Sequence, residues 1–181
     1  MRIVSILSLS TMSIVLAQTA DRQTSDIPYV PTPPAVVEAM LAMASLGADD
    51  VLIDLGSGDG RIVIAAAKQF GARAIGVELD HALVRESRSN AVREHVSNKA
   101  EFVEGDLFRQ DLHTASVVTL YLTPSVNLRL RPKLLKELAP GSRIVSHRFD
   151  MGSWRPDKTL VVDGETVFLW IVPRRTKLGA P

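Results

Sequence analysis

Short runs of β-type apolar residues alternate along the chain with longer stretches whose apolar positions recur at helical spacing. The β-type runs, each ending in a polar or glycine-containing turn, are residues 51–55, 72–78, 100–103, 116–122 and 142–147. The helical stretches are residues 62–68, 81–96 and 128–138, preceded by one that lies between a capping Thr32 and Gly47. Strands that alternate with helices predict an α/β domain built on a largely parallel sheet.

The pattern changes at the C-terminal end of the chain. Residues 159–162 and 166–172 are both β-type, with Asp163 and Gly164 in the turn between them. Asp-Gly between two β-type runs is typical of a two-residue hairpin. The sequence therefore predicts a terminal antiparallel hairpin rather than a second nucleotide-binding half.

The N-terminal segment differs in composition from the rest. Residues 1–17 are apolar and hydroxylic with Arg2 as their single charge, which is the layout of a signal peptide or a membrane anchor. A buried helix, or a start at Met12, is the alternative, so the prediction is export to the periplasm or membrane association, and a cytoplasmic location if the start is misassigned. We expect residues 18–27 to be a linker, 28–175 the domain and 176–181 a tail.

Composition narrows the function classes. A length of 181 residues, 46% hydrophobic and 23% charged, suits one globular domain. The absence of cysteine excludes disulfides, thiolate zinc sites and a cysteine nucleophile. A net charge of +1 gives no electrostatic signature of nucleic acid binding, and no pattern of residues suggests a metal site.

The most informative stretch is VLIDLGSGDGR, residues 51–61. An apolar strand runs directly into Gly56, Gly58 and Gly60, whose missing side chains permit positive φ and let a ligand lie against the backbone. A dinucleotide fingerprint would have its third glycine where this chain has Arg61. Asp54 precedes the loop, and a carboxylate there suits a ligand with an ammonium or sulfonium charge better than a pyrophosphate.

Two further acids follow the next two predicted strands. Glu78 ends the second strand about twenty residues beyond Gly58, the place where this kind of fold puts a carboxylate that accepts ribose hydroxyls. Asp106 and Leu107 follow the third strand. Because parallel strands end at the same edge of a sheet, we expect these residues to lie near the glycine loop.

These motifs resemble those of the class I S-adenosylmethionine (SAM) dependent methyltransferases, in which a Rossmann-like seven-stranded sheet ends in an antiparallel hairpin. Residues 28–172 are similar to the family that contains the ATP synthase c-subunit lysine N-methyltransferase and its bacterial relatives, in the stretches PYVPTP (28–33), DLGSGDGRIVIAAA (54–67), GVELD (76–80), EGDLF (104–108), LKELAPGSRIVSHRF (135–149) and W-x-P (154–156).

The resemblance implies methyl transfer from SAM to a lysine side chain of a protein, and the family's eukaryotic members are membrane-associated. It implies that the methionine part of SAM is held by Asp54, Gly56, Ser57 and Gly58, the ribose by Glu78 and the adenine by Asp106. Gly60 and Leu107 complete the expected cofactor site.

The acceptor side is predicted from strand ends alone. Tyr121 and Thr123 follow the fourth strand, and His147, Asp150 and Trp154 follow the fifth. A lysine must be neutral to accept a methyl group, and burial beside a cationic sulfonium lowers its pKa. We therefore expect a channel lined by Tyr121, His147 and Trp154, with Tyr121 and His147 as catalytic residues. Tyr29 and Thr32 are candidates to touch the cofactor or to close over the acceptor.

Three other functions remain alternatives. A small-molecule or lipid methyltransferase would share every cofactor residue and differ only in its acceptor pocket. A non-catalytic SAM-fold binding protein would keep the cofactor residues and methylate nothing. An NAD-dependent oxidoreductase is disfavoured by Asp54, Arg61 and the terminal hairpin. The sequence predicts neither the acceptor's identity nor the oligomeric state.

Overall fold

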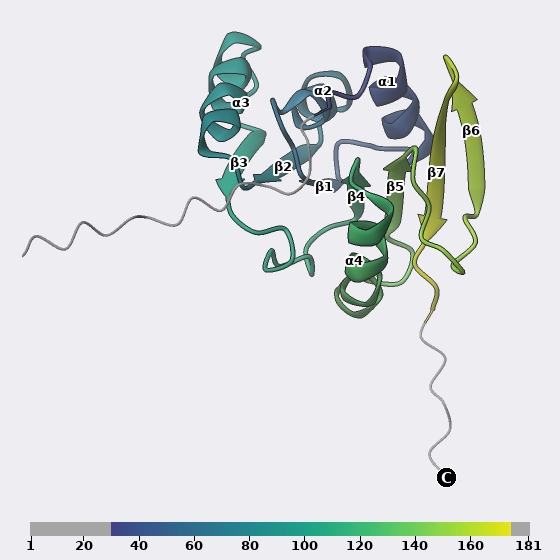
Figure 1. Ribbon diagram of the computed structural model, residues 1–181. Helices are drawn as coiled ribbons and strands as arrows, with labels where there is room; N and C mark the ends of the chain where they lie inside the picture. Colours follow the sequence, from purple (N-terminus) through teal and green to yellow (C-terminus); the bar gives the residue numbers. More distant parts are fainter. Residues whose placement is uncertain (1–29, 175–181) are drawn as a thin grey trace, which may run out of the picture.

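A computed structural model describes residues 30–174 of the chain (Figure 1). The helices are α1 (Pro34–Met43), α2 (Arg61–Phe70), α3 (His81–Arg93) and α4 (Pro124–Glu137). The strands are β1 (Val51–Leu55), β2 (Arg73–Glu78), β3 (Ala100–Glu104), β4 (Val117–Leu120), β5 (Arg143–His147), β6 (Lys158–Val162) and β7 (Glu165–Ile171). Every strand and helix expected from the sequence is present.

The strands of the described residues form one seven-stranded sheet in the order β3-β2-β1-β4-β5-β7-β6. β1 to β5 are parallel, whereas β7 runs antiparallel to β5 and β6 antiparallel to β7. The β6–β7 turn has positive φ at both Asp163 (52°) and Gly164 (81°), as a two-residue hairpin requires. This topology confirms the predicted class I methyltransferase fold.

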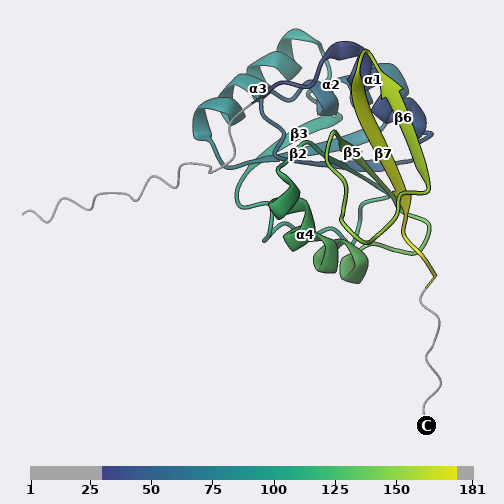
Figure 2. The ribbon, with the colours of Figure 1, turned by 45° about the vertical axis from the view of Figure 1, so that its right-hand side comes forward.

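The sheet is covered on both faces (Figures 1 and 2). α1, α2 and α3 lie over one face and α4 over the other. Each face has its own apolar cluster, with Leu52 of β1 in the first and Ile53 and Leu55 in the second. All three side chains have an exposed fraction of 0%, so β1 carries buried apolar residues on both faces, as expected of a parallel strand covered on both sides.

Two helices begin at residues other than those the pattern predicted. The N-cap of α1 is Pro33, and no side chain caps this helix, so Thr32 is not a cap. α4 begins at Pro124, four residues before the predicted start, because Thr123 is extended and a proline at the first helical position lacks only an N–H that would be unpaired anyway. Pro132 consequently lies inside α4 and not near its start.

The predicted signal peptide or anchor (1–17), the linker (18–27) and the tail (176–181) lie outside the described residues, as does Tyr29. Of the helices in residues 30–174, none combines the length and the apolar character needed to cross a membrane.

Candidate functional site

A cavity of about 1590 Å³ opens at the carboxyl ends of the parallel strands. Its wall is formed by residues 30–32, the glycine loop, and the residues that end or follow β1, β2, β3 and β4. Asp54, Glu78 and Asp106 line one region of it, which we call the cofactor end. Tyr121 lines another part of the wall. We use the term tyrosine end for this residue together with residues 30–32, residues 147–149 and Glu165.

The glycine loop has the backbone geometry that its sequence predicts. Gly56, Gly58 and Gly60 have φ of 82°, 53° and 83°, values that glycine adopts without strain. The N–H groups of Gly56 and Ser57 donate to the carbonyl of Val77 at 2.9 and 3.0 Å, which fixes the loop to the end of β2. The loop is therefore a rigid part of the cavity wall.

Gly60 has a packing role. A Cβ at this position would lie 2.6 Å from the ring of Phe102, and Gly60 is the N-cap of α2. Among the described residues, those that line the cavity include Gly56, Ser57 and Gly58 but not Gly60. The third glycine thus allows α2 to pack closely on β3.

Asp54 is the most perturbed acid of the cofactor end. Its side chain is 2% exposed, and the hydroxyl of Thr119, its direct partner across β1 and β4, donates to Oδ1 at 2.7 Å. The pKa of Asp54 is raised to about 7, chiefly by burial and in smaller part by the charges of Glu78 and Asp59, against the opposing Thr119 hydrogen bond. A cationic ligand would favour the ionised carboxylate.

Glu78 joins the end of β2 to the glycine loop. Its Oε2 accepts the N–H of Gly58 at 2.9 Å, and its Oε1 accepts those of Leu79 and Asp80 at 2.8 and 3.0 Å. A carboxylate offers about four lone-pair sites, so capacity is left to accept a hydrogen bond from a ligand hydroxyl. The backbone bonds fix the direction in which this carboxylate presents its oxygens.

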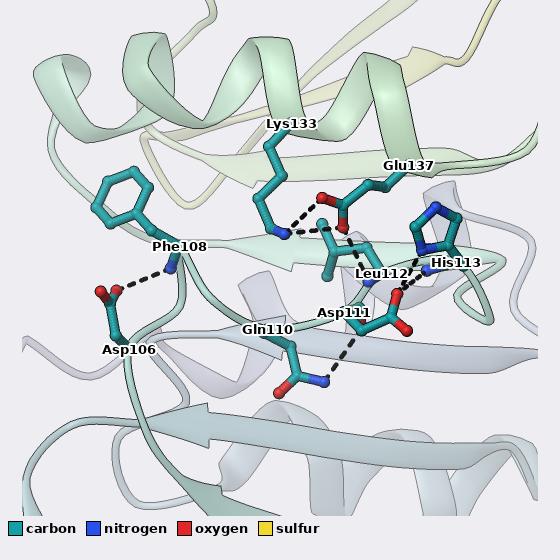
Figure 3. Close-up of polar contacts among 8 residues, drawn as sticks. All are labelled: Asp106, Phe108, Gln110, Asp111, Leu112, His113, Lys133 and Glu137. Carbon is teal, nitrogen blue, oxygen red and sulfur yellow. Dashed lines mark hydrogen bonds and ion pairs between the residues drawn. The ribbon is translucent and has the colours of Figure 1, made fainter.

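Asp106 lies on the cavity wall after β3. Its Oδ1 accepts the N–H of Phe108 at 2.8 Å, which uses one of the two carboxylate oxygens (Figure 3). Leu107 lines the cavity beside it, and the guanidinium of Arg129 lies 4.3 Å from the centre of the Phe108 ring. An acid beside apolar and aromatic side chains suits a planar base that carries an amino group.

These groups fit SAM. The acids of the wall include Asp54, Glu78 and Asp106, which suit a ligand with positive charge, hydroxyls and an amino group. Ser57 adds a hydroxyl that is 6% exposed as a residue and has no hydrogen-bond partner within the described part of the chain. A buried polar atom without a partner is costly, and a polar ligand at the loop would reduce that cost.

The tyrosine end differs from the predicted channel. Within residues 30–174, the cavity wall includes Tyr121 but neither His147 nor Trp154. His147 is 1% exposed and lies behind Tyr121, with 3.9 Å between the two ring centres. Trp154 belongs to the apolar cluster that contains the α4 residues, where its ring lies 6.0 Å from that of Trp170. The expectation that Trp154 and His147 line an acceptor channel is therefore corrected.

His147 connects segments that are distant in the sequence. Its Nδ1 is 3.3 Å from the Thr32 hydroxyl, and its Nε2 is 3.3 Å from a carboxylate oxygen of Glu165. Burial lowers the pKa of His147 below its ordinary value, although Glu165 opposes this shift. A neutral, buried histidine with both nitrogens engaged suits a structural or positioning role.

Two other acceptor candidates lie at the ends of these elements. Thr123 is the N-cap of α4, and its hydroxyl is 3.1 Å from that of Ser125. Asp150 is exposed, and its Oδ1 accepts the N–H of Gly152 at 2.9 Å. The structure thus gives both residues a local role in a turn.

A group of three potential metal ligands, Asp111, His113 and Glu137, lies outside the cavity wall (Figure 3). Their ligand atoms lie within 4.8 Å of one another. Lys133, however, pairs with both carboxylate oxygens of Glu137, at 2.7 and 2.8 Å. Glu137 also accepts the N–H of Leu112, so these contacts brace the loop before β4 against α4.

The comparisons with known proteins agree with this geometry. Residues 54–158 match the model of the family described as the ANTKMT methyltransferase domain. The chain belongs to this family. The prediction of a class I SAM-dependent methyltransferase is thereby confirmed.

Individual relatives match about four fifths of the chain. A protein of Saccharolobus islandicus named protein-lysine N-methyltransferase is 44% identical over 81% of this chain and 94% of its own. The human ATP synthase c-subunit lysine N-methyltransferase is 38% identical over 80% of this chain, but the match spans 61% of the human protein. A crystal structure described as an RNA methyltransferase from Salinibacter ruber, in complex with S-adenosyl-L-homocysteine, has a TM-score of 0.80 and 51% identity, and covers 84% of this chain and 99% of that one.

Sequence reasoning missed several residues that shape the methyltransferase site. Thr119 lies inside an apolar run, and only the strand register reveals it as the partner of Asp54. Arg61 stands out in the sequence only because it occupies the position of the third glycine in a dinucleotide fingerprint. In the structure, its guanidinium donates to the carbonyl of Thr32 at 2.9 Å. Arg148 gives no sequence signal, although it has a positive φ of 69° at the tyrosine end.

Proposed function

We propose that this methyltransferase transfers a methyl group from SAM to a lysine side chain of a protein. The observation that carries the proposal is the Saccharolobus islandicus relative named protein-lysine N-methyltransferase, which matches along 94% of its length at 44% identity. The eukaryotic relatives named as lysine methyltransferases support the same acceptor chemistry.

At the cofactor end, we propose that Asp54, Ser57 and the backbone of Gly56 and Gly58 hold the methionine part of SAM. The remaining lone pairs of Glu78 would accept the ribose hydroxyls, and Asp106 would accept the adenine amino group. The support for these roles is the position of each group on the cavity wall and its fixed direction.

When bound, SAM would supply an electrophilic methyl carbon on its sulfonium. An uncharged amine would form the new N–C bond in line as the C–S bond breaks, so that S-adenosyl-L-homocysteine would leave and the methylated ammonium would release a proton to solvent. The chain's part is to bring the acceptor nitrogen to about 3 Å from that carbon and to exclude water, and such positioning contributes about 7–11 kcal/mol. Tyr121 is half-buried on the cavity wall, so its hydroxyl is the side-chain group that we assign to orienting the acceptor amine.

The test uses the purified chain, tritium-labelled SAM, and a total extract of the organism that encodes the protein. We expect label in protein that protease digestion releases and ribonuclease does not, and N-methyl-lysine in the hydrolysate. Glu78→Ala is the negative control, because it removes a proposed cofactor contact. Absence of N-methyl-lysine from a reaction that consumes SAM would overturn the lysine proposal.

RNA is the second candidate acceptor, because the Salinibacter ruber structure is described as an RNA methyltransferase at 51% identity. Label that ribonuclease releases and protease does not would establish it. The net charge of +1 gives little overall electrostatic attraction for RNA, which is why we rank it second. Label that extracts into organic solvent would instead indicate a small-molecule or lipid acceptor.

A further inference from the structure

Three consecutive residues converge on the ring of Tyr121. The His147 ring centre lies 3.9 Å from that of Tyr121, and the Phe149 ring lies stacked on it at 6.3 Å with 22° between the planes. The side chain of Arg148, between them in the sequence, interacts electrostatically with that of Tyr121, and this interaction raises the pKa of the guanidinium. The tyrosine of the cavity wall thus interacts with each of the three residues 147–149.

An extended strand could not make these three contacts, because successive side chains point to opposite faces of a sheet. The chain turns at Arg148 instead. Its φ is 69°, and the N–H of Phe149 donates to the carbonyl of His147 at 2.8 Å, which closes a three-residue γ-turn. A γ-turn with positive φ at a non-glycine residue is rare and strained, and such strain persists only where the surroundings enforce it.

The surroundings of this turn are rigid. His147 is held on one side by Thr32 and on the other by Glu165. The carbonyl of Phe149 accepts the Ser146 hydroxyl at 2.6 Å and the amide of Asn127 at 3.1 Å. The N–H of Arg148 itself donates to the carbonyl of Thr166 at 2.6 Å. Groups from α4, β5, β7 and residues 30–33 therefore fix the turn.

We propose that residues 147–149 form a clamp on Tyr121, in which Arg148 is the positioning residue that directs the tyrosine hydroxyl toward the acceptor. The inference rests on the proposed function only for the identity of that acceptor. Arginine is purely a donor, so the phenol oxygen must be the acceptor in its interaction with Tyr121. One lone pair and the O–H hydrogen of Tyr121 then remain to orient an amine.

The charge around the clamp supports this assignment. The pKa of Arg148 is raised, first by the hydrogen bond to Tyr121 and then by the Glu165 carboxylate. Glu165 is therefore shared between the Nε2 of His147 and the charge of Arg148. Arg148 is exposed, Phe149 is half-buried and His147 is buried, so the guanidinium is the member of the clamp most open to solvent.

The first test reads Tyr121 without any acceptor. The chain has two tyrosines, so in a Tyr29→Phe background Tyr121 gives the single tyrosine signal of protein labelled with ring-¹³C tyrosine. We expect Arg148→Met to shift this signal and to broaden it, because the hydroxyl loses its partner. Arg155→Met, at an arginine further along the loop, is the matched control and should leave it unchanged. An unmoved signal in Arg148→Met would overturn the clamp.

The second test measures turnover on the lysine acceptor. Arg148→Met should lower kcat about fivefold, as expected for an exposed charged contact, and leave the dissociation constant of SAM unchanged. Arg148→Lys should recover part of the loss. In a Tyr121→Phe background the effect of Arg148→Met should vanish, and an undiminished effect there would overturn the positioning role. Failure to find a lysine acceptor would overturn the proposed function, while the NMR signal still decides the clamp.

Discussion

The two ends of the cavity are built by different means. The cofactor end consists of acids that each lie in or just after a different strand, Asp54 in β1, Glu78 in β2 and Asp106 after β3, together with a glycine loop. The tyrosine end brings together residues 30–32, Tyr121, residues 147–149 and Glu165, which are up to 135 positions apart in the sequence. Strand order alone places the first set, whereas the second depends on side-chain contacts between distant segments.

The two ends also respond to pH with opposite signs. Asp54 has a raised pKa because it is buried as an acid, and His147 has a lowered pKa because it is buried as a base. Protonation therefore stabilises the fold at the cofactor end and destabilises it at the tyrosine end. Each end can be changed separately by a substitution that removes its titration.

The largest effect is expected for Asp54→Asn. The folded pKa of about 7 lies above the unfolded value of 3.8, so the native state binds more protons between these values and loses stability as pH rises through them. The separation of about 3.2 pH units corresponds to about 4 kcal/mol. In urea unfolding, we expect the free energy of unfolding of Asp54→Asn to rise relative to that of the wild type between pH 4 and pH 7. The difference should persist at pH 8.

The same variant should bind SAM more weakly at pH 8, because the amide cannot offset a positive ligand charge. A gain in stability with a loss of binding is the usual sign of a strained functional residue. If the difference in stability between Asp54→Asn and the wild type were the same at pH 4 and at pH 8, Asp54 would be ionised and solvated in the folded protein. Equal SAM affinity would separate Asp54 from the cofactor end.

Glu78→Ala should weaken SAM binding about 100-fold in a calorimetric titration, since it removes two hydrogen bonds to a charged group. It also frees the N–H groups of Gly58, Leu79 and Asp80 from their acceptor. Glu101→Ala is the control, because Glu101 is an exposed acid of the neighbouring β3 with a 3.7 Å ion pair to Arg73. Similar losses in both variants would show a general charge effect.

The difference between the two ends explains how much could be predicted from the sequence. The seven strands, the hairpin at Asp163-Gly164 and the strand-end acids follow from local patterns, and the structure places Asp54, Glu78 and Asp106 on one wall. Trp154 was misplaced because the sequence does not show that the loop after β5 packs into the apolar cluster of the α4 face.

His147 was misplaced for a different reason. A strand end predicts that the residue lies at the carboxyl edge, and His147 does lie there, but the burial that makes it inaccessible comes from Tyr121, Thr32 and Glu165. The turn at Arg148 likewise arises from contacts with other segments. No local pattern contains this information.

His147→Gln tests the opposite sign at the tyrosine end. The folded pKa lies below the unfolded value of 6.5, so the native state binds fewer protons and the wild type should lose stability relative to the variant as pH falls below about 6.5. The measurement is the difference in urea unfolding between the two proteins at pH 5 and pH 8. Because Asp54 is present in both, its titration cancels. A difference that is constant with pH would show that His147 keeps its ordinary pKa.

The smallest effect is expected at Thr32, where the two ends meet. Its hydroxyl contacts His147 of the tyrosine end, and its carbonyl accepts the guanidinium of Arg61, beside the glycine loop. Thr32→Val removes the first contact and keeps the second, so the free energy of unfolding should fall by about 1 kcal/mol. SAM affinity should stay within about twofold and kcat should fall, because only the support of His147 is lost.

Thr159→Val, on the exposed strand β6, is the matched control for replacing a hydroxyl by a methyl group. If SAM affinity falls as much as in Glu78→Ala, the hydroxyl of Thr32 serves the cofactor end, and the division of the cavity at this residue is wrong.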